Sequence, residues 1–279
     1  MQWQALEKQF QSLCERVKKP YRQEMAEILG PRFKAGAWAW DPLVEIRQWA
    51  DIDRLTDVVM GPLFTCPRHD WPMRDGRPMA PLIQLDLGRA SVLSGLPLGD
   101  GLLQVWMPHK VVAGADQYVR VVPRAAVNSA DLTPIPTIPE DLDPLQSLEA
   151  TGTGFQVMGW SEPRYTTPLA HGFQAHYPLK KLTADAALAR EIQDFDRALL
   201  ALVQGTTAPF SPVNSHLFGT FAEVQYAPQD RLQPLFCFDG PAWGEESCGL
   251  GWGDGGNAQL FFSLDADGAV SFSFDWSSC

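Results

Sequence analysis

The feature that most limits how this chain can fold is its frequent interruption by proline and glycine, 23 of each in 279 residues. These residues end helices and strands, so most ordered segments between them must be short. The apolar runs between them are typical of strands, with examples at 82–87, 102–107, 118–122, 235–238, 259–264 and 270–274. The proline-rich stretch 133–139 cannot join a central strand and is expected to be an extended connector.

Two segments have helical periodicity instead. Near the N-terminus, apolar residues recur at steps of three and four, at Trp3, Leu6, Phe10, Leu13 and Val17. Pro20 interrupts this pattern, which resumes until Gly30. The run holds too few heptads for a coiled coil, so we expect it to pack on the body of the protein.

A second helix is predicted near 184–204. Thr183 is expected to cap it, Asp185 suits its first turn, and Gly205 follows its last turn. Its buried stripe is predicted to be Leu188, Ile192, Phe195, Leu199 and Leu202.

A faint internal repeat relates the two halves of the chain. The segment 81–86 is echoed by 234–239, and the turn 99–101 is echoed by 253–255, each turn preceding an apolar strand. We therefore expect an α+β fold. Its mostly antiparallel β body would contain two pseudo-repeated strand–turn–strand units, with an N-terminal helical segment and one long helix near 184–204. The predicted domains are an N-terminal helical extension, 1–60, and an α+β domain, 61–279.

The net charge of −11 is unevenly distributed. Residues 1–130 carry 16 basic and 14 acidic residues, whereas residues 131–279 carry 6 and 19. No Lys or Arg occurs in 125–163 or in 232–279. A field of this sign repels nucleic acid and anionic lipid and attracts a basic partner. The alternative interpretation is that the acidic surface only keeps an aromatic-rich protein in solution.

Sequence patterns also predict the cellular location of the protein and the oxidation state of its cysteines. No stretch is long and apolar enough to span a membrane, and the first ten residues carry charges where a signal peptide has its apolar run. We therefore expect a cytoplasmic protein. The five cysteines lack paired spacing and are expected to be reduced thiols, mostly in the core: Cys14, Cys66, Cys237, Cys248 and Cys279.

Motifs that would identify a cofactor or metal site are missing from the sequence. There is no Walker A loop, HExxH or GxSxG motif, and the glycine cluster 249–256 precedes a strand rather than a phosphate-binding helix. The two closest histidines, His171 and His176, are five residues apart. This spacing does not put two side chains on the same face of a helix or of a strand. We expect no cofactor and no metal.

The best acid–base candidate is the loop 66–70, which holds a thiol, an imidazole and a carboxylate in Cys66, His69 and Asp70. The competing interpretation is a polar turn in which Asp70 binds local backbone groups, and this interpretation is favoured. Asp100 and Asp254 occupy the two matched turns, where glycine-flanked aspartate is expected for conformational reasons. The tryptophans Trp38, Trp40 and Trp49 are expected in the core or on a partner surface.

The chain resembles the YwqG-like family, a bacterial domain of unknown function, over about residues 60–279. The resemblance is carried by two ordered sets of segments: 71–76, 78–79, 82–87, 96–97 and 101–104, then 216–219, 235–239, 251–256 and 260–262. The sequence departs from the family in the weakened Gly-Gly-x-Pro opening before Trp71. The resemblance implies a mostly β, α+β body without an established catalytic residue. It also implies a link to bacterial toxin genes, beside which members resemble immunity proteins.

We therefore expect a non-enzymatic immunity protein that neutralises a basic, nuclease-type effector toxin. The residues expected to contact this partner are Glu140, Asp141, Asp143, Asp239, Glu245, Glu246 and Asp254. One alternative is a small-ligand site or enzyme between the repeated units, with His69, Asp70 or Asp254 inside it. The other is a housekeeping interaction protein with an unrelated partner.

Overall fold

The structure is a computed structural model that describes residues 2–24, 37–108, 118–137, 152–166, 177–204, 215–219, 232–238 and 257–277. Its contacts divide the chain into two units. Unit 1 comprises 1–40, 162–210 and 218–221, and unit 2 comprises 41–161, 211–217 and 222–279. The predicted division at residue 60 stays a prediction. No helix among the described residues is both long and apolar enough to cross a membrane.

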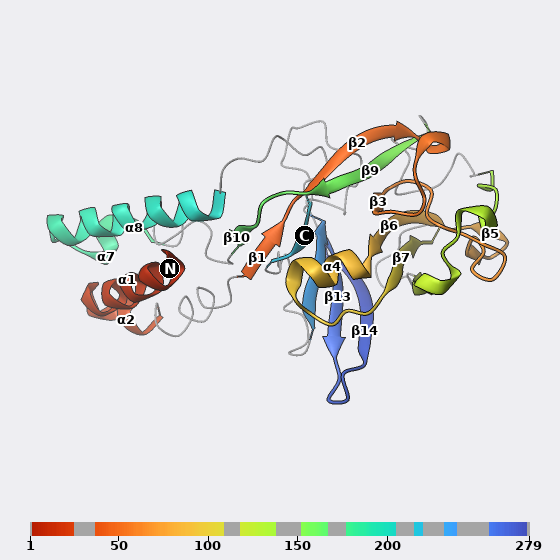
Figure 1. The fold of residues 1–279 in the computed structure, drawn as a ribbon. Helices are drawn as coiled ribbons and strands as arrows, with labels where there is room; N and C mark the ends of the chain where they lie inside the picture. The colour runs from red at the N-terminus through yellow and green to blue at the C-terminus, as the bar shows by residue number, and fades with distance from the viewer. Residues whose placement is uncertain are drawn as a thin grey trace. The chain divides into compact units, whose positions relative to one another are not determined.

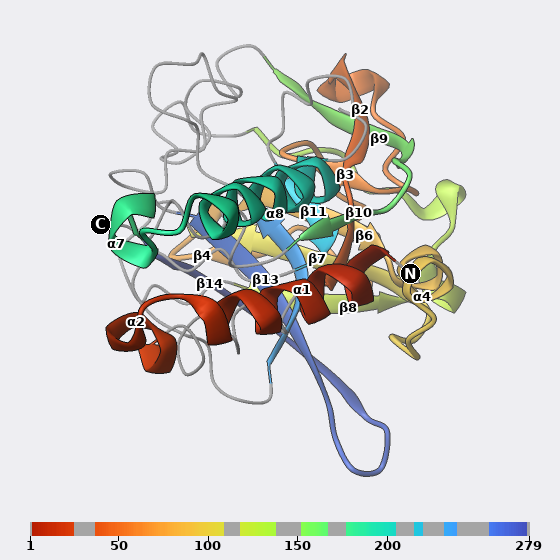
Figure 2. The ribbon, with the colours of Figure 1, turned by 90° about the vertical axis from the view of Figure 1, so that its left-hand side faces the viewer.

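Unit 1 is built on two helices from distant parts of the sequence, α1 (Gln2–Arg16) and α8 (Ala186–Gln204). They lie side by side in Figure 2. The shorter helices α2 (Lys19–Glu24) and α7 (Leu179–Leu182) flank them, and strands β1 (Ala37–Trp40) and β10 (Arg164–Thr166) pair antiparallel. The described part of the N-terminal periodicity is therefore helical, and the break falls just before Pro20, which lies in the first turn of α2.

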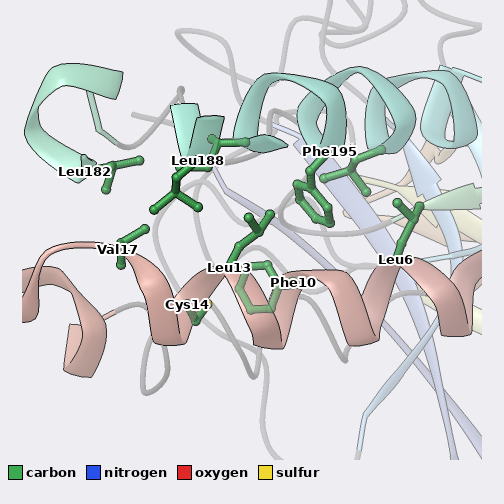
Figure 3. Close-up of a cluster of buried hydrophobic side chains, with 10 residues drawn as sticks. Leu6, Phe10, Leu13, Cys14, Val17, Leu182, Leu188 and Phe195 are labelled. Atoms are coloured by element: carbon green, nitrogen blue, oxygen red, sulfur yellow. The ribbon is translucent and has the colours of Figure 1, made fainter. Parts of the chain in front are cut away.

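The predicted apolar stripes form the core of unit 1, apart from Trp3 and Leu202, whose side chains lie outside the described part of the chain. Figure 3 shows the α1 side chains pointing toward those of α8 and α7. The buried cluster consists of Leu6, Phe10, Leu13, Cys14, Val17, Leu182, Leu188, Ile192, Phe195 and Leu199. Burial and nearby Glu15 raise the pKa of Cys14 to about 12, so this thiol is protonated and structural.

The start of α8 differs in one detail from the prediction. The cap is Asp185, whose Oδ1 accepts from Ala187 N at 2.7 Å. Thr183 instead follows α7, and its Oγ1 accepts from Asp185 N at 3.0 Å. Aspartate and threonine both cap well, and the short helix α7 moves the start of α8 two residues later than expected.

Unit 2 contains a six-stranded antiparallel sheet in the order β2-β9-β3-β6-β7-β8. Its strands are β2 (Pro42–Gln48), β9 (Thr153–Trp160), β3 (Val58–Val59), β6 (Ala80–Asp86), β7 (Gly101–Met107) and β8 (Tyr118–Pro123). Helix α4 (Leu87–Ser94) connects β6 to β7 (Figure 1), and β4 (Met73–Arg74) pairs with β5 (Arg77–Pro78). The 3-10 turns are Trp49–Asp51, Arg124–Ala126 and Ser129–Asp131.

A second run of antiparallel strands follows the order β11-β12-β13-β14. These strands are β11 (Ser215–Phe218), β12 (Gln233–Phe238), β13 (Asn257–Leu264) and β14 (Val270–Ser277). The predicted α+β fold with a mostly antiparallel β body and one long helix is therefore confirmed. The described part of the proline-rich connector, 133–137, lies outside helices and strands, as expected.

The pseudo-repeat stays a prediction, but the strand registers supply support for it. In the first sheet, Val58 pairs with Gln84, Gln84 with Gln104, and Gln104 with Arg120. In the second, the same sequence of pairs runs His216, Cys237, Gln259, Asp275. The register shifts at Pro81/Ile83 in β6 and at Pro234/Phe236 in β12, which are equivalent positions at the offset of 153 residues.

Candidate functional site

The predicted partner-contacting residues lie outside the described part of the chain. This holds for all seven: Glu140, Asp141, Asp143, Asp239, Glu245, Glu246 and Asp254. In the basic-free stretch 232–279, the acidic residues that the structure does describe are Asp265, Asp267 and Asp275. All three are exposed and belong to the β13–β14 hairpin. This hairpin is therefore the described acidic surface of the stretch 232–279.

The hairpin turn is closed by a defined set of hydrogen bonds. Asp265 N donates to Ala269 O, and Gly268 N donates to Asp265 O, both at 2.9 Å. Gly268 has φ +83, a left-handed conformation that glycine adopts without strain. Asp267 Oδ1 accepts from Ala269 N at 3.2 Å. These contacts keep a carboxylate-bearing turn in one conformation, with residues 265–269 all exposed.

The two faces of the hairpin have different chemistry. One face carries Ser263, Ser271, Ser273 and Asp275, with the Ser263 and Ser271 hydroxyls 2.7 Å apart, and also the buried Gln259 and Phe261 of β13. The other face is apolar, with Leu260 opposite Phe274 and Phe262 opposite Phe272. The polar face is exposed along β14, whereas the apolar face is buried or half-buried. The hairpin thus combines carboxylates, hydroxyls and a nearby aromatic surface.

The loop 66–70 has the contacts of a structural turn. Cys66 and His69 exchange two backbone hydrogen bonds, of 3.1 and 2.9 Å. Asp70 Oδ1 accepts from Trp71 N at 2.8 Å and from Thr133 Oγ1 at 3.4 Å. The carboxylate thus binds local backbone, as the favoured interpretation of this sequence predicts.

Arg120 fastens this loop to the sheet. Its guanidinium donates to Gln104 Oε1 at 2.7 Å and to the carbonyls of Asp70 and His69 at 2.8 and 3.2 Å. It also lies 5.5 Å from the ring centroid of Trp106. Burial, Arg120 and Arg68 together lower the pKa of His69, which is therefore neutral at pH 7.

The matched aspartates are not described as a pair, because Asp254 lies outside the described residues. Asp100 accepts from Arg124 Nε at 3.1 Å, and Arg124 also pairs with Asp86 at 2.6 Å. Asp86 is itself the N-cap of α4 and accepts from Arg89 N. Asp100 thus takes part in an exposed ion-pair network at the β6–α4–β7 connection.

Asp57 is a buried titratable residue that the sequence analysis missed. Its side chain is 1% exposed. Its carboxylate accepts from Asp86 N, from Trp160 Nε1 at 3.2 Å and from Arg89 at 3.1 Å. Burial raises the pKa of Asp57 to about 6, although these three donors oppose the shift. The donors come from β6, β9 and α4, so the carboxylate joins three segments of unit 2.

Three glutamines buried within the first sheet form a second polar feature that was missed. Gln84 Oε1 accepts from Phe64 N and from Gln104 Nε2, both at 2.8 Å. Gln84 Nε2 donates to the carbonyls of Arg54 and Thr56. Gln156, on β9, binds Asp53 N through its Oε1 at 2.6 Å. These amides bind the irregular segments around the sheet, so their role is structural.

The other sequence-predicted residues are dispersed. Trp40 packs edge-on against Phe218 in unit 1, and Trp38 is 51% exposed. In unit 2, Trp49 donates to Thr153 O at 3.0 Å. Three of the cysteines are buried and reduced: Cys14, Cys66 and Cys237. Cys248, Cys279, His171 and His176 lie outside the described residues. Within the described ranges, no group of three or more His, Cys, Asp or Glu side chains is arranged to hold a metal ion.

Comparison with known proteins assigns no family to this chain. No family model matches it, and no curated protein matches it. The functional argument therefore depends on the surface chemistry described above.

Proposed function

We propose that this chain is a non-enzymatic immunity protein of the bacterial cytoplasm that binds and neutralises a basic, nuclease-type effector toxin. The observation that carries the proposal is the exposed acidic β13–β14 hairpin, within a 48-residue stretch, 232–279, that contains no Lys or Arg. A surface of this charge attracts a basic protein and accelerates its encounter with the inhibitor. It also disfavours nucleic acid, whose phosphates carry the same sign of charge.

Nuclease active sites bind phosphate and are therefore basic, and carboxylates can occupy the same positions. An inhibitor of this kind needs charge complementarity for fast association and apolar anchors for slow dissociation. The hairpin carries the charge on its exposed aspartates, Asp265, Asp267 and Asp275, and its opposite face presents the half-buried ring of Phe272. Membership of the YwqG-like family is part of the same proposal.

The ligand-site alternative receives less support from the described residues. Asp70 is hydrogen-bonded to Trp71 and Thr133, and Asp100 is paired with Arg124. The contacts of these two carboxylates do not direct either of them to a site shared with the His69 side chain. A general acid–base pair requires such convergence on one reacting group.

The experiment is co-expression of this chain with the product of its neighbouring gene in a host that this product kills. We expect rescue of growth and a purified complex whose affinity falls steeply between 50 and 500 mM salt, because charge drives its formation. Growth arrest in the presence of well-expressed chain, without a complex, would rule the proposal out. A salt-insensitive complex with rescue would keep the immunity role and remove the electrostatic mechanism.

A further inference from the structure

The edge of β14 that faces away from β13 differs from the other sheet edges in the described structure. An exposed edge strand is normally protected against pairing by proline or by charged side chains, most often lysine. Edge strand β2 has Pro42 and Arg47, and edge strand β8 has Arg120 and Pro123. Edge strand β14 has neither proline nor a basic residue, and its eight pairs with β13 run without a bulge. It therefore keeps the regular edge that can accept another strand.

The hydrogen bonding of the turn determines which backbone groups face outward. Asp265 N donates to Ala269 O, so these residues form a hydrogen-bonded pair. Hydrogen-bonded and non-hydrogen-bonded pairs alternate along an antiparallel ladder. The amides and carbonyls of Val270, Phe272, Phe274 and Trp276 consequently point away from β13. Among the described strands, β13 is the single hydrogen-bonded neighbour of β14. Strand β8 comes near β14 but does not pair with it.

The end of the hairpin is accessible to a large partner. In Figures 1 and 2, the loop joining β13 to β14 lies clear of the other strands of unit 2. The exposed residues include the whole turn 265–269. The Ser263–Ser271 contact and the turn hydrogen bonds hold this region in a strand conformation before any partner binds. Such preorganisation lowers the entropic cost of association.

The charges along the edge select the kind of strand that fits. Asp265, Asp267 and Asp275 are exposed, with no Lys or Arg in 232–279 to balance them. A second copy of β14 would bring these carboxylates near their own equivalents, which disfavours self-pairing. A strand with Lys or Arg at alternating positions would place them beside Ser271, Ser273 and Asp275 on the exposed face.

We propose that the β14 edge binds an extended, lysine- or arginine-bearing segment of the effector, which adds to the sheet as a further strand. This inference rests on the proposed function, since it names the surface that engages the same basic partner. Main-chain hydrogen bonds to the outward groups of Val270 and Phe272 provide affinity. The alternating basic side chains provide specificity.

The test compares variants that differ in one property at a time, with the purified product of the neighbouring gene as the probe. Phe272→Pro removes an outward N–H and obstructs the edge, whereas Phe272→Thr removes the same ring and keeps the N–H. We expect Phe272→Pro to bind at least about tenfold more weakly than Phe272→Thr. Equal affinities for the two variants would overturn the proposal.

A second pair of variants keeps the test valid if Phe272→Pro fails to fold. Ser273→Lys adds a positive charge on the exposed face of β14, and Gln193→Lys adds the same charge on the exposed face of α8. We expect the affinity for the probe to fall at least about tenfold for Ser273→Lys and to stay unchanged for the control Gln193→Lys. Hydrogen exchange provides the direct readout, because the outward amides of Val270 and Phe272 are expected to slow in the complex. Unchanged exchange in β14 would overturn the proposal.

The outcomes separate this inference from the function on which it rests. If the wild-type chain does not bind the probe, the proposed function fails and the inference fails with it. If the wild-type chain binds but all β14 variants bind equally well, the inference alone fails. A wild-type dimer that Phe272→Pro converts to monomers would show that the edge pairs with a second copy, which also overturns it.

Discussion

The buried carboxylate of Asp57 makes the stability of this protein depend on pH in a direction opposite to that of most aspartates. Its pKa rises from 3.8 to about 6 on folding because burial penalises the charged form. In the unfolded chain the group loses its proton first. The folded state is therefore favoured by this group below pH 3.8, and the advantage is lost as the pH rises through 6. The shift corresponds to about 3 kcal/mol in full and to about 1.4 kcal/mol between pH 5.0 and 7.5.

The perturbation is Asp57→Asn, which removes the titration and keeps the size of the side chain. We expect the unfolding free energy of the wild type, relative to that of Asp57→Asn, to fall by about 1.4 kcal/mol between pH 5.0 and 7.5. Urea unfolding followed by tryptophan fluorescence measures both proteins at each pH. The control is Asp131→Asn, which removes one exposed carboxylate and reports the effect of net charge.

Two results would refute this reasoning. Parallel stability curves for the wild type and Asp57→Asn would show that the carboxylate titrates equally in both states. A difference that grows in favour of the wild type as the pH rises would show that the donors at Asp86 N, Arg89 and Trp160 outweigh burial. In that case the pKa of Asp57 would be below its ordinary value.

Three further predictions concern stability. Gly154→Ala should lower the free energy of unfolding by about 1–3 kcal/mol, because a Cβ there would lie 2.7 Å from Gly61 Cα and Met60 O. Gly159→Ala on the same strand has room for the methyl group and serves as the control. Urea unfolding measures both variants. Phe195→Ala should cost about 3–5 kcal/mol by the same assay, with exposed Gln193→Ala as its control, because it opens a cavity in the core of unit 1. Gln84→Met should lower the free energy of unfolding by about 3 kcal/mol or more, because Phe64 N and other buried groups lose their hydrogen-bond partner. Thermal unfolding measures this loss. A loss of only a few tenths of a kcal/mol would show that water replaces the amide.

The elements that the sequence predicted are those with local signals. The stripe Leu188, Ile192, Phe195 and Leu199 is buried as predicted, because one helix face must be covered whatever covers it. The strands 102–107 and 259–264 also follow from their apolar runs. What periodicity could not supply was the partner of each face: α1 packs against α8, more than 160 residues later, and no local pattern encodes that choice.

Polar residues were harder to interpret, since their role depends on burial. Gln84, Gln104 and Gln156 sit within strands, and their amides bind backbone in irregular segments far away in the sequence. A glutamine inside an otherwise apolar strand was the available signal. Asp57 gave no comparable signal, because it lies in a polar stretch between Asp53 and Val58 and is buried only by tertiary contacts.

The strand registers give a physical reason for assigning different roles to the two sets of strands. Arg120 and Asp275 are each paired with a buried glutamine on the neighbouring strand, Gln104 and Gln259 respectively. Arg120 is half-buried, and its guanidinium fastens the loop 66–70 to the sheet. This side chain of edge strand β8 therefore makes contacts within the protein. Asp275 is exposed on a strand that carries no cation. The first sheet thus has an arginine at this register that fastens a loop, whereas the second has an exposed carboxylate, so β14 is the strand to test first for the proposed partner.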